Sequence, residues 1–86
     1  MLYRTMAILE RTDPDRSIDR WYSVAIQQTL LDSIAVVCVY GNRCSSWQKA
    51  YALSAESIEE AEMVASKIVF KKIHRGYILV EMNSVD

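Results

Sequence analysis

Hydrophobic and polar positions alternate along residues 21–28, where Tyr22, Val24 and Ile26 fall on one side of an extended chain. A period of two is typical of a strand that buries one face. Residues 34–41 are almost all apolar and rich in β-branched side chains, which predicts a central strand. Further strands are predicted over residues 3–9, 47–53 and 77–82.

A polar segment, residues 11–19, separates the first two of these strands. It is centred on Asp13-Pro14-Asp15, in which the proline fixes its own φ angle and the aspartates favour turns. We therefore expect a loop across the whole segment.

The period of the pattern changes after residue 56. Ser57 and Glu60 form a capping box that predicts the start of a helix, and Gly76 suits a left-handed C-terminal cap. Between them apolar residues recur every three or four positions, on a stripe made of Ile58, Ala61, Ala65, Ile68 and Val69 and extended by the stem of Lys72. Such a stripe is expected to lie on the sheet. The residues thus predict an α+β fold with one amphipathic helix packed on one face.

Length and composition narrow the functions open to the chain. A chain of 86 residues is expected to form a single domain, residues 1–86, with no room for a separate catalytic module. Its 10 Lys and Arg against 11 Asp and Glu give a net charge of -1, so no overall basic field draws it to nucleic acid. The 2 glycines cannot build a Gly-rich phosphate loop, which excludes nucleotide-dependent chemistry of that kind.

Residues suited to catalysis or metal binding are few and isolated. His74 is the only histidine, no Cys-x-x-Cys pair occurs, and Cys38 lies within the apolar central strand. Cys44, beside Arg43, is the more reactive thiol but has no evident general base. We therefore expect no enzyme, no metal and no cofactor. With no export signal and no apolar run long enough to span a membrane, a cytoplasmic location with reduced thiols is expected.

Several short strings occur in an order that resembles the WGR domain, a family named after its Trp-Gly-Arg motif. They are Asp13-Pro14-Asp15-Arg16, Arg20-Trp21-Tyr22, Gln28-Thr29-Leu30-Leu31, Tyr40-Gly41-Asn42, Ile58-Glu59-Glu60-Ala61 and Lys72-Ile73-His74-Arg75-Gly76-Tyr77. The resemblance spans residues 3–80 and implies an antiparallel sheet with one helix against it. It also implies nucleic-acid binding, because WGR domains are regarded as nucleic-acid-binding modules. The chain looks like the short, free-standing bacterial members of that family.

The name motif itself departs from the family pattern. Tyr40 stands in place of the tryptophan and Asn42 in place of the arginine, while Arg43 follows one residue later. A tyrosine ring still stacks on a sugar or base, whereas asparagine cannot neutralise a phosphate. In the closing string, Ile73 and His74 occupy positions where family members usually carry basic residues.

The candidate nucleic-acid-binding residues are one aromatic and four basic side chains, namely Tyr40, Arg43, Lys71, Lys72 and Arg75. The expected mode is phosphate neutralisation with aromatic stacking and no base readout, giving weak, salt-sensitive binding to DNA or RNA. A second explanation of the basic residues stays open, because cations at a helix C-terminus complement the helix dipole.

A protein partner is the alternative. Met63 and Phe70 share a helix face that is not the apolar stripe. Exposed apolar pairs on a small domain can mark interaction sites, so the alternative function is a protein-interaction or self-associating module that has lost nucleic-acid binding. Its partner would be another protein or a second copy of the chain. Neither a membrane nor a small-molecule substrate is expected.

Overall fold

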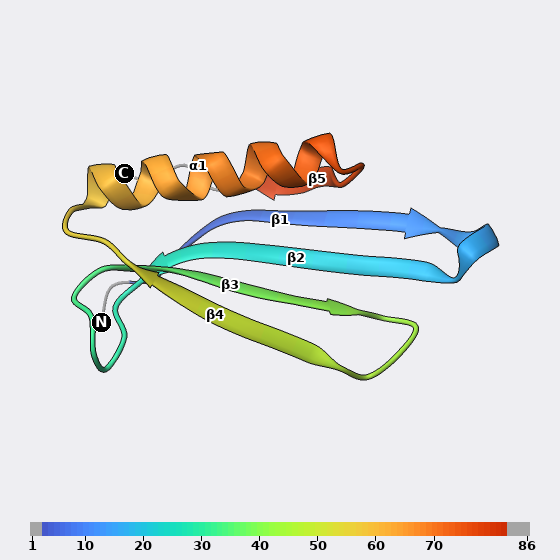
Figure 1. The fold of residues 1–86 in the computed structure, drawn as a ribbon, viewed down its shortest axis with the longest axis horizontal. Helices are drawn as coiled ribbons and strands as arrows, with labels where there is room; N and C mark the ends of the chain where they lie inside the picture. The colour runs from blue at the N-terminus through green and yellow to red at the C-terminus, as the bar shows by residue number, and fades with distance from the viewer. Residues whose placement is uncertain (1–2, 83–86) are drawn as a thin grey trace.

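A computed structural model describes residues 3–82 of the chain, with side chains from residue 6 onward. The strands are β1 (Tyr3–Asp13), β2 (Ile18–Gln27), β3 (Ala35–Asn42), β4 (Gln48–Ser54) and β5 (Ile78–Met82), and the helix is α1 (Ile58–His74). They form a five-stranded sheet in the order β4-β3-β2-β1-β5, in which every neighbouring pair is antiparallel (Figure 1). The predicted α+β class, an antiparallel sheet with one helix on one face, is confirmed.

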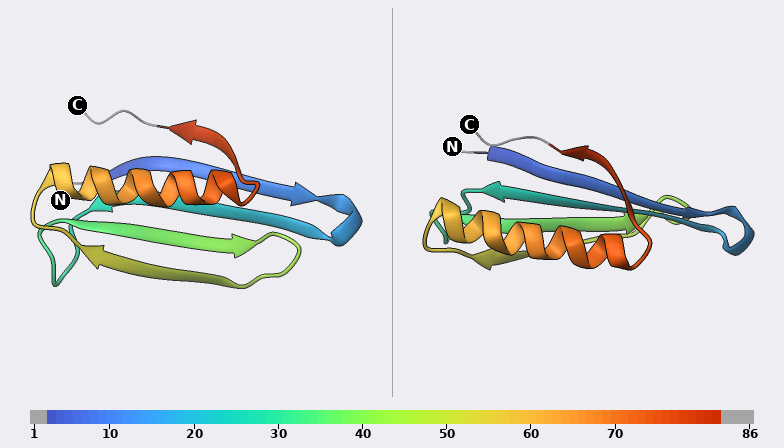
Figure 2. Two further views of the ribbon diagram at one scale, coloured as in Figure 1. Left: turned by 45° about the horizontal axis from the view of Figure 1, so that its top comes forward. Right: turned by 90° about the horizontal axis from the view of Figure 1, so that it is seen from above.

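The helix connects the two edges of the sheet. The chain leaves edge strand β4, runs back along one face as α1 and ends in β5 beside β1 (Figure 2). Ser57 caps the first turn, because its Oγ accepts a hydrogen bond from the backbone N of Glu60 at 3.1 Å. At the other end Gly76 has a φ of 97°, the region that glycine adopts without strain. Both predicted ends of the helix are confirmed.

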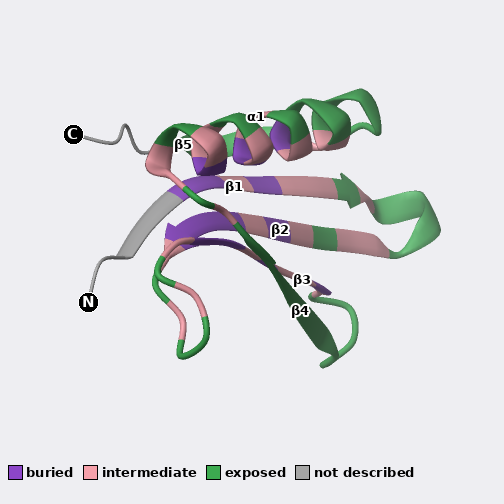
Figure 3. Cartoon of the chain, turned by 60° about the vertical axis from the view of Figure 1, so that its left-hand side comes forward, coloured by how far each residue is buried: buried purple, intermediate pink, exposed green. Residues whose placement is uncertain are grey.

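The hydrophobic core lies between α1 and the middle of the sheet. Tyr22, Val24 and Ile26 are buried on the helix side of β2, as their alternation predicts. Opposite them the buried face of the helix consists of Ala61, Ala65 and Val69, with Ile58 and Ile68 packed partly buried against it. Small residues on this stripe let the helix approach the strands closely. Figure 3 shows the buried segments of α1 and the sheet facing each other.

The loop predicted over residues 11–19 is wrong in extent. β1 continues to Asp13 and β2 begins at Ile18, so only the 3-10 turn of Pro14–Arg16 and Ser17 separate the two strands. Their pairing continues through Arg11 opposite Arg20. This part of the hairpin extends away from the core, as the exposed segments in Figure 3 show, so its residues are polar although its backbone is extended. The polar sequence of this segment therefore does not indicate the regular strands that it forms.

The second face of the sheet points away from α1. On it Trp21 of β2 lies opposite Gly41 of β3, and the next pairs are Ser23 with Val39 and Ala25 with Val37. A Cβ added at Gly41 would lie 3.1 Å from Nε1 of Trp21, so the indole packs across the glycine. Edge strand β4 is exposed along its whole length.

Candidate functional site

Arg43 and Tyr40, both candidate nucleic-acid contacts, lie on opposite faces of the sheet. Arg43 Nη1 donates a hydrogen bond to Oδ1 of Asp19 at 3.0 Å, and Nη2 donates to the carboxylate of Glu10. Glu10 pairs with Trp21 in the ladder, which places this ion-pair group on the face away from α1. The hydrogen bond to Glu10, and then that to Asp19, raise the pKa of Arg43 above its ordinary value. Two carboxylates thus balance the guanidinium charge.

Tyr40 lies on the helix face at the centre of an aromatic cluster, which we define as Tyr22, Tyr40, Trp47, Tyr51 and Tyr77. Its ring stacks on Tyr22 with centroids 5.4 Å apart and planes inclined by 13°. Trp47 and Tyr51 meet it edge-on at 6.2 Å and 6.3 Å. Tyr40 is therefore half-buried and already engaged by neighbouring rings.

The aromatic cluster has a buried and an exposed side. Tyr22 is only 3% exposed, whereas Tyr51 and Trp47 are 40% and 46% exposed. The Tyr22 and Tyr51 hydroxyls share a hydrogen bond with the oxygens 2.5 Å apart. Burial, followed by this hydrogen bond, raises the pKa of Tyr22 well above its ordinary value, and burial also raises the pKa of Tyr51. Both hydroxyls thus stay protonated, and the exposed ring surface belongs to Tyr51 and Trp47.

Lys72 connects the aromatic cluster to the end of the helix. Its Nζ lies 4.5 Å from the ring centroid of Tyr22 and 5.8 Å from that of Tyr77. Burial lowers the pKa of Lys72, and the nearby charges of Arg75, Lys71 and Arg20 lower it further. Among the residues whose side chains are described, no carboxylate forms an ion pair with it. Lys72 is thus a cation held against aromatic rings, with other cations near enough to lower its pKa.

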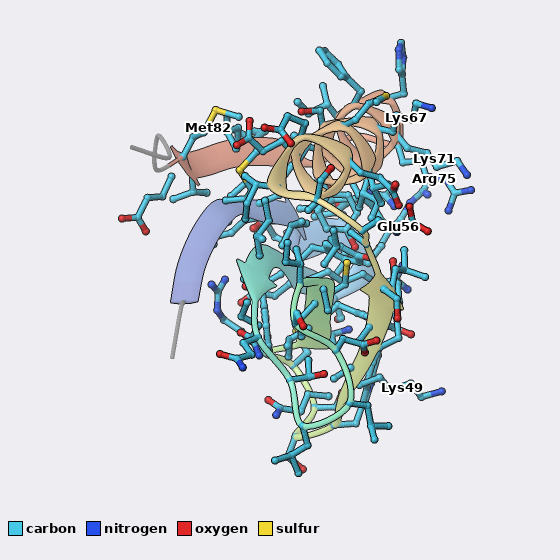
Figure 4. All side chains as sticks on the ribbon, turned by 90° about the vertical axis from the view of Figure 1, so that its left-hand side faces the viewer. Lys49, Glu56, Lys67, Lys71, Arg75 and Met82 are labelled. Carbon is cyan, nitrogen blue, oxygen red and sulfur yellow. The ribbon has the colours of Figure 1, made fainter. Side chains whose placement is uncertain are left out.

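These cations come from three elements and form what we call the basic cluster, namely Arg11, Arg20, Lys71, Lys72 and Arg75. Arg11 of β1 reaches the helix end, since its Nε lies 3.5 Å from the position a Cβ would take at Gly76. Arg20 of β2 pairs with Arg11 in the ladder, which places both on the helix side of the sheet. Figure 4, an end-on view, shows Lys71 and Arg75 extending from α1 to the same side as Lys49 from β4.

The structure brings together four of the five predicted nucleic-acid-binding residues and separates the fifth. Tyr40, Lys71, Lys72 and Arg75 belong to the adjoining aromatic and basic clusters, and Arg43 does not. Sequence reasoning missed Arg20, although its signal was present, because it precedes buried Tyr22 by two positions and so shares its side of the strand.

The other singled-out residues lie away from this site. Met63 and Phe70 are 57% and 66% exposed on α1, as their place outside the apolar stripe predicts, and their role as a partner interface stays a prediction. Cys38 is buried and Cys44 is exposed in the turn after β3, and neither forms a disulfide. In the described part of the chain, no group of three or more His, Cys, Asp and Glu is placed to hold a metal ion. Likewise, no helix within it is long and apolar enough to cross a membrane.

Comparison with known proteins returns no similar protein. No protein-family model, no curated protein and no solved structure matches this chain.

Proposed function

We propose that the protein is a non-catalytic nucleic-acid-binding module that uses the basic cluster and the exposed rings of Trp47 and Tyr51. The observation that carries the proposal is the position of Lys72. Its ammonium group lies on the ring of Tyr22, and the charges of Arg75, Lys71 and Arg20 are near enough to lower its pKa, while no carboxylate among the described side chains forms an ion pair with it. A phosphate group would relieve the mutual repulsion of these cations.

The helix dipole explains part of this arrangement but not all of it. Lys71, Lys72 and Arg75 stand in or just after the last turn of α1, where cations complement the negative end of the dipole. Arg11 and Arg20 belong to β1 and β2, however, and the helix dipole gives no reason for them. The position of these two strand cations near the helix end supports the proposal that this site binds an anion.

In this proposal the exposed aromatic rings provide the stacking on nucleic acid. Tyr40, which stands where WGR domains carry the tryptophan of their name motif, is covered on one face by Tyr22. Tyr51 and Trp47 flank it and retain exposed surface. We propose that these two rings stack on exposed sugars or bases, while the basic cluster neutralises phosphates without reading sequence. Membership of the WGR family is part of the same proposal.

The experiment is a fluorescence-anisotropy titration of labelled DNA, both single-stranded and duplex with a free end, at two salt concentrations. Four or five phosphate contacts predict a slope of log K against log salt of about -3 to -4. Replacing Lys71, Lys72 and Arg75 together by alanine is expected to abolish binding. Arg43→Ala, which removes one cation from the opposite face, is the matched control and should leave affinity unchanged.

Two results would contradict the proposal. One is the absence of binding at tens of micromolar protein in low salt, where non-specific binders with dissociation constants of about 1–100 μM are detected. The other is equal binding by the triple variant and the native protein, which would place the contact elsewhere.

A protein-interaction module is the second candidate, favoured by the exposure of Met63 and Phe70 on α1. Replacing both by glutamate leaves the buried stripe intact, so the fold should persist. If this face joins the chain to a partner or to a second copy, the mass of the complex in solution should fall to that of the monomer. An unchanged mass would exclude this face.

A further inference from the structure

Leu30 and Leu31 are the most exposed large apolar residues in the described part of the chain. They lie in the connection between β2 and β3 and are 105% and 94% exposed. Two adjacent leucines in water are unfavourable, because each fully exposes an apolar side chain. The connection that carries them projects from the sheet as a loop (Figure 3), and their full exposure on it requires an explanation.

The turn that carries the leucines is fixed by hydrogen bonds. The backbone N of Thr29 donates to the carbonyl oxygen of Asp32 at 2.9 Å, and the backbone N of Asp32 donates to Oγ1 of Thr29 at 2.9 Å. The hydroxyl of Ser54 on β4 donates to Oδ1 of Asp32. The two leucines are thus presented outward from a turn that is closed on itself and bonded to the sheet.

An apolar hollow lies at the base of the same loop. It has a volume of about 220 Å³ and is lined by Ile26, Ile34 and Ile58 together with Gln27, Gln28 and Ser33. The hollow is large enough to accept a leucine side chain, and its walls are mostly aliphatic. Only the length of this loop separates the two leucines from the hollow.

We infer that this loop joins two copies of the chain, with Leu30 and Leu31 of each copy packing into and over the hollow beside Ile34 and Ile58 of the other. A two-fold axis between two loops lying side by side in opposite directions brings each tip to the base of its partner. Such an isologous contact buries both complementary surfaces at once, because one chain carries the projection and the hollow together. A single chain cannot bring its own tip into its own hollow through so short a loop.

The charges of the segment favour a second copy over a lipid surface. Residues 27–34 contain one charged side chain, Asp32, and each of its carboxylate oxygens accepts a hydrogen bond. Two such segments meet with little repulsion. The segment also offers no cation to lipid phosphates, which apolar anchors on membrane surfaces usually provide.

The dimer leaves the basic cluster open. Ile58 begins α1 and Lys72 lies in its last turn, about 21 Å away at 1.5 Å per residue. Dimerisation and nucleic-acid binding therefore use opposite ends of the helix, and each can fail without the other.

The test is sedimentation equilibrium of the full chain from micromolar to millimolar concentration. The native protein is expected to dimerise, and Leu30→Ser with Leu31→Ser should raise the dissociation constant by about 100-fold or more, since two leucines are lost from each copy. Ser33→Phe, which fills the hollow and keeps both leucines, should have the same effect. Val80→Ser with Met82→Ser, which removes two exposed apolar side chains from edge strand β5, is the control and should leave the dimer intact. Circular dichroism checks that each variant folds.

Three outcomes would overturn the inference. The first is a native chain that stays monomeric at millimolar concentration. The second is a dimer that survives both the double-leucine and the Ser33→Phe changes. The third is leucine-dependent binding of a monomer to phosphatidylcholine vesicles, which would make the loop a membrane contact. Nuclear Overhauser contacts between the leucine methyl groups of one copy and the Ile58 methyl groups of the other would support it directly.

Discussion

The ammonium group of Lys72 lies 4.5 Å from the centre of the Tyr22 ring, and Tyr22 is itself almost fully buried. A long flexible cation is thereby held by packing against the rigid centre of the domain. Much of the entropy that a surface lysine loses on binding an anion is already lost in the folded protein. For the phosphate contact that we propose, this packing would hold Lys72 in place before binding, and the proposal can be tested at this residue.

Replacing Lys72 by methionine keeps an unbranched stem and removes the charge. The free energy of unfolding should change by no more than about 1 kcal/mol, because a partly exposed cation–π contact contributes little. Affinity for DNA should fall, and the salt slope should become shallower by about 1. Arg16→Met, which removes one charge from the turn between β1 and β2, is the control and should leave the salt slope unchanged. An unaltered slope in Lys72→Met would argue against a phosphate contact.

The tyrosine pair predicts a loss of stability in alkali. Tyr22 and Tyr51 both have a raised pKa in the folded protein, so they hold protons that the unfolded chain releases above pH 10. Their stabilising contribution is complete below that pH. Above it, stability falls by up to about 1.4 kcal/mol per pH unit for buried Tyr22, and by less for Tyr51, which is 40% exposed and therefore screened by solvent.

Urea denaturation on both sides of pH 10 measures this loss. Tyr22→Phe removes one titrating group, so its stability should fall less steeply with pH than that of the native protein. Lys72 changes stability with pH in the opposite direction, because its lowered pKa makes stability rise toward pH 10.5. Both proteins contain Lys72, so its contribution cancels when their pH dependences are compared. Identical pH dependence in the two would show that Tyr22 ionises normally.

Gly41 is expected to tolerate no side chain. A Cβ at this position would lie 2.8 Å from the carbonyl oxygen of Trp47 and 3.1 Å from the indole Nε1 of Trp21. Gly41→Ala should therefore cost about 1–3 kcal/mol of stability and shift the tryptophan fluorescence. Ser45→Ala in the adjoining turn should cost less than about 0.5 kcal/mol. Equal effects of the two changes would disprove the close approach.

The N-terminal cap of α1 is a further measurable contribution. Ser57→Ala removes the hydroxyl that accepts from Glu60, at a cost of about 1 kcal/mol and a fall in melting temperature of about 4–8 °C. Ser66→Ala, in the middle of the same helix, should leave the melting temperature unchanged or raise it slightly, because alanine is the better helix former. Calorimetry of the two variants distinguishes a capping serine from any other.

The parts of the fold that the sequence predicts well are those that form the core. Residues 21–28 and 34–41 were expected to be strands, and β2 and β3 occupy Ile18–Gln27 and Ala35–Asn42. Burial of one face imposes the alternation from which these strands can be read. The sequence does not predict the ends of β1 and β2 because no buried apolar side chain lies there, and backbone pairing alone leaves no apolar pattern.

The candidate site likewise has a part that the sequence predicts and a part that it does not. Lys71 and Lys72 lie in the last turn of α1 and Arg75 is its C-cap, so their grouping follows from helical spacing. The ion pairs of Arg43 could not be predicted from the sequence, because its partners, Glu10 and Asp19, lie 33 and 24 residues away in the chain. Only the pairing of the strands reveals which side of the sheet each residue occupies.

The two ion pairs of Arg43 also make the distribution of charge over the molecule asymmetric. On the face away from α1 one guanidinium meets two carboxylates, while the end of α1 gathers cations whose charge is not balanced locally. A protein with a net charge of -1 can thus adhere to a cation-exchange resin through one side and to an anion-exchange resin through the other. Which side it turns toward a charged surface, rather than its total charge, decides where it attaches.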